Sequence, residues 1–212
     1  MTLNTTLRGQ RTKATRDYIL NAAFDLLINH PELPLSHEAV AKAGGIGSRT
    51  VYRYFPAQAD LFEAMWQKVR ERSGTVFPTA EAEIIPKIAV MFRAFDENEK
   101  LVRAVMESAA GARVRAQGAA EGRASFDQSL NGVTRGFSSV ERRQMRSVFQ
   151  CIHSGPFWQM LHDRGELNAP EAIAAASWAA QVLLDALRHR QRNSRSNANH
   201  SSKKGNHRND NH

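Results

Sequence analysis

The residues best suited to chemistry lie in the stretch SRTVYRYF, which begins at Ser48. Arg49 and Arg53 carry guanidinium groups, and an arginine can donate two hydrogen bonds to the edge of a guanine in the major groove of DNA. The hydroxyls of Ser48 and Thr50 can reach bases or phosphates, and Tyr52 can combine apolar contact with a hydrogen bond to phosphate. These residue types favour a surface that binds DNA.

The elements that must position this stretch are predicted to be helices. Apolar residues recur at helical spacing over residues 14–30, and the pattern stops before Pro31. Ser36 is placed to cap a second helix over residues 37–44, which ends at a pair of glycines. The first two helices are therefore separated by a short linker.

The SRTVYRYF stretch forms the third predicted helix. Val51 and Phe55 take its inward face, whereas Tyr54 can pack inward or lie along the DNA backbone. Pro56 opens a fourth helix. Two short helices joined by a glycine-bearing turn, with longer helices packed behind them, form the helix-turn-helix plan. An ordinary helical hairpin is commoner among proteins, but it does not usually place so many polar and basic side chains outward on so short a second helix.

The stretch VAKAGGIGSRTVYRYFPAQADLFEAM resembles the DNA-binding signature of the TetR (tetracycline repressor) family of transcriptional regulators. With matches in the first helix, the resemblance covers about residues 12–66. The matching residues are Val40, Ala41, Gly45, Ile46, Thr50, Val51, Tyr52, Tyr54, Phe55 and Leu61, with Ile19, Leu20, Ala22 and Ala23 before them.

The sequence also departs from the family pattern. Gly44 stands where the family usually has alanine. Gly47 replaces the serine that usually caps the third helix, so the cap is expected to shift to Ser48. The sequence that begins at Ala57 lacks a lysine, which removes one expected phosphate contact.

The resemblance implies an all-α chain with an N-terminal three-helix helix-turn-helix DNA-binding domain and a larger helical dimerisation and ligand-binding domain. The first, with a basic N-terminal arm, is expected over residues 1–70, and the second over residues 71–190. A disordered basic tail follows over residues 191–212, because it has almost no apolar residue. Such a chain is expected to bind a palindromic operator in double-stranded DNA as a homodimer, most often as a repressor, and to be released by a small-molecule effector of unknown identity.

The predicted DNA contacts combine residues of the third helix with flanking residues at the starts of the first two helices. A solvated surface charge is nearly as good an interpretation for any one of the flanking residues. The set is Arg11, Lys13, Thr15, Ser36, His37, Gly47, Ser48, Arg49, Thr50, Tyr52, Arg53 and Tyr54.

Two further sites follow by analogy with the family. An effector pocket would use bulky residues of the helical body: Trp66, Phe92, Phe95, Met106, Phe126, Phe149, His153 and Trp158. A hydrogen-bonded core histidine is the better interpretation of His153. The dimer interface would use an apolar seam, together with the helix around Ser139 to His153, unless that seam packs inside its own domain; the seam is Ile173, Ala176, Ala180, Leu183 and Leu187.

Composition and charge limit the kinds of location, cross-link and metal site that the chain can have. The net charge of +8 is concentrated near the two ends of the chain, and the stretch between them is slightly acidic. Without an apolar run that could span a bilayer or serve as a signal core, the chain is expected in the cytoplasm. Cys151 is the one cysteine, so an internal disulfide and a multi-cysteine zinc site are excluded, and a buried role is expected for it. No cofactor and no metal are predicted.

Two other functions fit the sequence less well. An enzyme would need Cys151 and His153 to act together, but two residues apart on a helix they point in different directions. A sequence-independent architectural DNA-binding protein would need only the basic regions. The outward set on the third helix favours specific reading of a groove instead.

Overall fold

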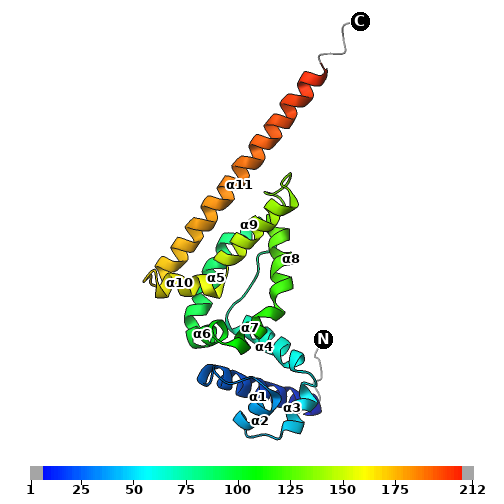
Figure 1. Cartoon of the computed structure of the whole chain (residues 1–212), viewed down its shortest axis with the longest axis vertical. Helices are drawn as coiled ribbons and strands as arrows, with labels where there is room; N and C mark the ends of the chain where they lie inside the picture. The colour runs from blue at the N-terminus through cyan, green and yellow to red at the C-terminus, as the bar shows by residue number, and fades with distance from the viewer. Residues whose placement is uncertain (1–6, 207–212) are drawn as a thin grey trace. The chain divides into compact units, whose positions relative to one another are not determined.

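The computed structural model describes residues 7–206, and the surroundings of side chains within residues 9–193. Regular structure in this range is helical throughout, which confirms the predicted all-α class (Figure 1). No helix in the described range is long and apolar enough to cross a membrane. The elements are α1 Leu7–Asn29, α2 His37–Ala43, α3 Ser48–Tyr54, α4 Gln58–Arg72, the 3₁₀ turn η1 Glu81–Glu83, α5 Ile84–Glu97, α6 Glu99–Glu107, α7 Ala109–Gln117, α8 Ala119–Leu130, α9 Ser139–Ile152, α10 Gly155–Asp163 and α11 Ala169–Asn206.

The helices divide into two compact units. The N-terminal unit contains residues 1–75 and 94–120, and the C-terminal unit contains residues 76–93 and 121–212. The predicted division at residue 70 assigned α6 and α7 to the body. In the structure they group with the N-terminal helices, because α6 packs on α1 and α7 packs on α4.

The core of the N-terminal unit brings α1, α4, α6 and α7 together. Phe24, Leu61 and Met65 are almost completely buried in it. Gly118, at the end of α7, lies so close to the ring of Trp66 that a Cβ there would be 2.1 Å from a ring carbon. The glycine thus permits a large aromatic side chain of α4 to lie against the end of α7.

Gly111 plays a similar part where α7 turns back on α6. A Cβ at this position would lie 2.2 Å from the carbonyl oxygen of Val105 and 2.6 Å from its Cα. Because backbone must move to admit a methyl group, we expect Gly111→Ala to lower the free energy of unfolding by about 1–3 kcal/mol, measured by urea denaturation. Helix propensity alone would raise it by about 1 kcal/mol, so a stabilised variant would contradict this account.

The C-terminal unit is built around large aromatic side chains and the small residues of α11. Phe92, Phe126, Phe149 and Trp158 are at most 1% exposed. The long helix α11 packs against α9 and α10, and its Ala172, Ala176 and Ala180 are completely buried. Farther along, the guanidinium of Arg188 pairs with the carboxylate of Glu81 at 2.6 Å.

The predicted dimer seam on α11 must be corrected. Ala176 and Ala180 are fully buried, and Leu187 is 6% exposed, within a single chain. A side chain already covered by its own unit cannot also be covered by a partner. The face that packs internally is the set Ala172, Ala176, Ala180, Leu184 and Leu187, so the seam lies mainly inside the subunit.

Cys151 also differs from expectation, because it is exposed rather than buried. It shares one side of α9 with Val140, Gln144 and Val148, all of them exposed. The opposite side of α9 supplies Phe149 and Ile152 to the core.

The predicted disordered tail begins at residue 191, whereas the structure continues α11 as far as Asn206. Adding residues to a formed helix is easier than starting a new one, because each added residue gains a hydrogen bond without a new nucleus. Residues 207–212 of the predicted tail lie outside the described range.

His153, which follows α9, is a core histidine rather than an open pocket residue. Its side chain contacts the Phe126 ring edge-on at 5.1 Å. Its Nε2 lies 2.7 Å from the carbonyl oxygen of Ile84, and its Nδ1 lies 3.1 Å from that of Phe149. Burial lowers the pKa of this imidazole, and the two carbonyls oppose that shift only in part.

This lowered pKa makes a prediction about stability and pH. The unfolded chain protonates His153 near pH 6.5, while the folded chain does so only at lower pH, so acid favours unfolding. We expect the free energy of unfolding to fall more steeply from pH 7 to about pH 5 in the wild type than in His153→Gln. Chemical denaturation at each pH would reveal the difference, and parallel curves for the two proteins would contradict it.

Candidate nucleic-acid interface

The turn between α2 and α3 depends on its two glycines for different reasons. Gly45 has a φ of +61°, in the left-handed region that side chains other than glycine disfavour. Gly44 lies against α1, where a Cβ would come within 3.0 Å of the Cβ of Ala22. Its carbonyl oxygen accepts a hydrogen bond of 2.8 Å from the hydroxyl of Tyr18. Together these contacts fix α2 and its turn onto α1.

The ends of α2 and α3 are capped differently. The Oγ of Ser36 accepts a hydrogen bond of 3.1 Å from the backbone N–H of Ala39, which confirms the predicted cap of α2. The cap of α3 expected at Ser48 is not formed, because Gly47 takes the N-cap position and offers no side-chain acceptor. The first N–H groups of α3 are therefore not engaged by a capping side chain.

The inner face of α3 is anchored as predicted. Val51 and Phe55 are completely buried. The guanidinium of Arg16 in α1 lies over the ring of Phe55, 4.7 Å from its centre. The Nε2 of His37 lies 2.7 Å from the carbonyl oxygen of Phe55. With its inner face fixed by α1 and α2, α3 presents its other side outward.

The outer face of α3 carries polar and basic side chains. Arg49 is exposed, and within the described part of the chain its side chain has no hydrogen bond or ion pair. Arg53 is also exposed and lies over the ring of Tyr54, 5.2 Å from its centre. Ser48 and Thr50 are half-buried beside them. Arg49 is thus the side chain of α3 whose donors are most available to a ligand.

Tyr52 makes a contact that the sequence did not indicate. Its hydroxyl donates a hydrogen bond of 2.7 Å to the carboxylate of Glu38 in α2, and its ring stacks on that of His37 at 4.3 Å. The hydrogen bond lowers the pKa of Glu38 and raises that of Tyr52, so both groups keep their usual charges near neutral pH. The hydroxyl hydrogen expected to reach phosphate is given to Glu38 instead.

These helices match a known domain. The family model described as bacterial regulatory proteins, tetR family, matches residues 19–65. Residues 19–65 are therefore similar to the DNA-binding domain of TetR-family regulators. The matched residues run from α1 through α4 and include the turn and the whole of α3.

Individual TetR-family relatives are similar over different lengths. The HTH-type transcriptional repressor LfrR of Mycolicibacterium smegmatis is 35% identical over 79 residues, which are 37% of this chain and 41% of that protein. The chain thus aligns with less than half the length of this relative. A crystal structure of a TetR transcriptional regulator from Rhodococcus sp. RHA1 is similar with a TM-score of 0.46 and 20% identity, over 82% of this chain and 97% of that one.

The structure revises the flanking contacts predicted for this TetR-family domain. Arg11 and Lys13 precede the predicted first helix, which covers residues 14–30, whereas α1 begins at Leu7 and contains both of them as well as Thr15. Arg11 and Lys13 are exposed and lie about 200° apart around the helix, so they face different directions. The Thr15 hydroxyl donates to the carbonyl of Arg11 at 2.9 Å.

The side chain of His37 is too enclosed by its neighbours to make the predicted DNA contact. It is 5% exposed, its ring is covered by Tyr52, and one of its nitrogens lies beside the carbonyl oxygen of Phe55. Its role is to hold α2 and α3 together. Glu38 was missed because its partner Tyr52 is fourteen residues away, and no local spacing pairs them.

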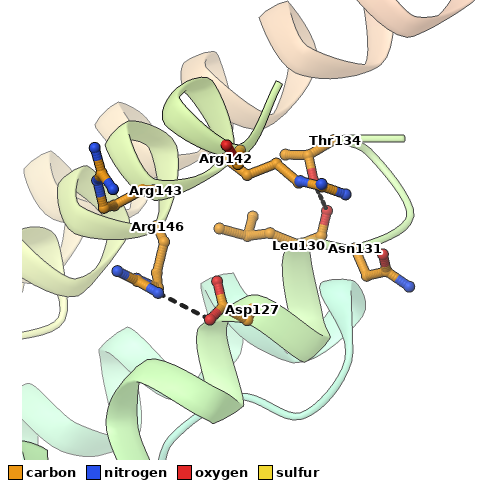
Figure 2. Close-up of a pocket in the computed structure, with 8 residues that line it drawn as sticks. Asp127, Leu130, Asn131, Thr134, Arg142, Arg143 and Arg146 are labelled. Atoms are coloured by element: carbon orange, nitrogen blue, oxygen red, sulfur yellow. Dashed lines mark hydrogen bonds and ion pairs between the residues drawn. The ribbon is translucent and has the colours of Figure 1, made fainter. Parts of the chain in front are cut away.

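The predicted effector residues fall in both units. Trp66, Phe95 and Met106 belong to the N-terminal unit, and the other five belong to the C-terminal unit. All of them except Met106 are buried. A surface cavity of about 420 Å³ in the C-terminal unit is lined by other residues, of α8, α9 and the loop between them (Figure 2).

Proposed function

We propose that the protein is a sequence-specific DNA-binding transcriptional regulator that acts as a repressor. The observation that carries this proposal is the outer face of α3, where Arg49 is exposed and without a partner among the described residues, while Val51 and Phe55 hold the helix from behind. A short helix held in this way can enter the major groove and present an arginine to a guanine edge. The match to a repressor, LfrR, supports repression as the outcome.

Dimerisation is part of the proposal, and it moves to a different face of α11 from the one predicted. Trp178 is 72% exposed and Val182 is 48% exposed, and they lie one turn apart. Ala174 and Ala186 continue the same side with small side chains that permit close approach. This stripe is the outward side of the helix, away from the buried Ala176 and Ala180.

The neighbouring helix α9, which packs on α11, has a second stripe of this kind. Val140 is 49% exposed and Val148 is 41% exposed, and Gln144 lies between them. Large exposed apolar side chains that line up along helices mark surfaces that bind another protein. We infer that α9 and α11 of two copies pack as four helices around a two-fold axis.

Such a dimer defines the kind of DNA site. Two copies of α3 related by a two-fold axis meet an inverted repeat, with half-sites separated by about 34–36 Å or more. A small effector releases the dimer from this site only if it prefers a conformation in which the two α3 helices are wrongly spaced. Operator DNA must then weaken effector binding by the same factor.

Selection of bound fragments from random double-stranded DNA tests the proposal. We expect one enriched inverted repeat, with half-sites about 10 base pairs apart or somewhat more, centre to centre. Fragments retained without any enriched sequence would instead support a sequence-independent architectural protein. Enrichment that Arg49→Ala leaves unchanged would remove α3 from its proposed role.

A further inference from the structure

The cavity in the C-terminal unit has a composition unlike that of an apolar effector pocket. It lies where α9 faces the end of α8 and the loop that follows (Figure 2). Its volume of about 420 Å³ is within the range of small-molecule sites. Three arginines and one aspartate line it, so its charged side chains sum to +2. Neither the sequence pattern nor the DNA-binding domain accounts for this concentration of charge.

The protein neutralises these arginines only in part. Arg146 pairs with Asp127 at 2.9 Å, yet its Nε is buried and has no hydrogen-bond partner in the structure. Arg142 and Arg143 are exposed and have no ion pair among the described residues. Figure 2 shows Arg142 reaching toward Thr134 and Arg146 toward Asp127. Unused guanidinium donors therefore border the space.

The remaining lining suits a small ligand rather than a charged polymer. Leu130, which is 2% exposed, supplies an apolar contact, and Asn131 and Ser139 supply polar ones. The hydroxyl of Thr134 donates to the carbonyl oxygen of Leu130 at 2.8 Å, so its oxygen remains an acceptor. Arginine matches the planar oxygens of carboxylates and the oxygens of phosphates better than any other side chain.

The cavity also stays open in the proposed dimer. At about 100° per residue, Arg142 and Arg146 lie on the side of α9 away from Val140 and Val148. The apolar stripe of α9 and the arginine face therefore serve different neighbours. A second copy that packs on the apolar stripe of α9 would therefore not cover the side of α9 that carries the arginines.

We propose that this cavity binds a small organic anion, a carboxylate or a phosphate ester, whose oxygens accept hydrogen bonds from Arg142 and Arg146. Only the regulatory role of that binding, as the effector site, rests on the proposed function. The binding itself does not depend on DNA. Its test therefore uses no operator DNA, so that a failure here and a failure of DNA recognition are separate results.

Calorimetric titration of the full chain with succinate and with inorganic phosphate, at constant ionic strength, tests the site. The neutral analogue succinamide is the ligand control. We expect saturable binding of at least one anion and none of succinamide. The double variant Arg142→Gln/Arg146→Gln should weaken that binding by about tenfold or more, because charge-assisted hydrogen bonds are lost. Arg123→Gln, which removes an exposed charge of α8 that does not line the cavity, should bind as the wild type does.

Misfolding could also weaken anion binding, so a variant that is expected to bind the anion more tightly serves as a second control. Asp127→Asn removes the carboxylate that competes for Arg146, so the anion should bind several times more tightly. No saturable binding of either anion, equal binding of succinamide, or equal weakening by Arg123→Gln would overturn the proposal. Random duplex DNA gives one more result that would overturn it. If this DNA displaces the anion from the wild type, and if the double variant no longer binds this DNA, then the arginines belong to a nucleic-acid surface.

Discussion

Arg49→Ala is expected to weaken binding to the selected DNA site by about 1–3 kcal/mol, which is about 5- to 150-fold in affinity. Its guanidinium is exposed on α3 and has no partner in the described part of the chain, so no contact within the protein is lost by the change. An arginine that reads a base makes this contact only on the specific site, so its replacement removes the contact only there. On random DNA of the same length the loss should be much smaller.

Two further variants make this measurement decisive. Arg49→Lys keeps the positive charge but lacks the planar pair of N–H donors that matches a guanine edge, so it should recover only part of the specific affinity. Arg123→Ala, in the C-terminal unit, should leave both affinities unchanged. Fluorescence titration at one fixed salt concentration measures all of them. Equal losses on specific and random DNA would make Arg49 a phosphate contact.

Trp178→Glu is expected to shift the protein from dimer to monomer, with a dimer dissociation constant raised by at least about a hundredfold. Trp178 is 72% exposed in a single chain, so replacing it removes little from the subunit's own core. In the proposed dimer the same position is covered, and an unpaired carboxylate there opposes association. Because two half-sites must be bound together, DNA affinity should fall with the dimer.

Sedimentation at several protein concentrations measures the change, and thermal melting shows whether the variant is folded. Val90→Glu is the matched control, because Val90 is 49% exposed on α5 and is not part of either stripe. The control should remain dimeric. A Trp178→Glu protein that sediments as the wild-type dimer would place the interface elsewhere.

The helices of the helix-turn-helix are the part best predicted from sequence, because their signals are local. Ser36 stands just before a helical pattern, and its side chain caps α2 as expected. Val51 and Phe55 lie four residues apart, as one face of a helix requires, and both are buried. The glycine pair has backbone requirements that few other residues meet.

The face of α11 was harder to predict, because that helix is rich in alanine on more than one side. Apolar residues at steps of three and four could be drawn through Ile173 and Leu183 as well as through Ala172 and Leu184. The side of α11 that faces the subunit's core is decided by α9 and α10, which pack on it and end before it in the sequence. The sequence shows Trp178 among small residues, but it does not show on which side of the helix this tryptophan lies.

Contacts between distant residues account for the other differences. Tyr52 and Glu38 pair across the helix-turn-helix, and His37 is buried by that pairing. The arginine cavity arises because α9 is placed against the end of α8, which no motif announces. Single-residue chemistry suggested phosphate contacts for Tyr52 and His37, whereas their neighbours in space give both of them a structural role.

The most direct test of sequence-specific recognition is an equilibrium titration of two duplexes at the same salt concentration. One contains the inverted repeat obtained by selection, and the other has the same length and composition in scrambled order. The outward side chains of α3 predict that the repeat binds at least about a thousandfold more tightly. Equal affinity for the two duplexes would contradict the assignment of α3 as a helix that reads DNA sequence.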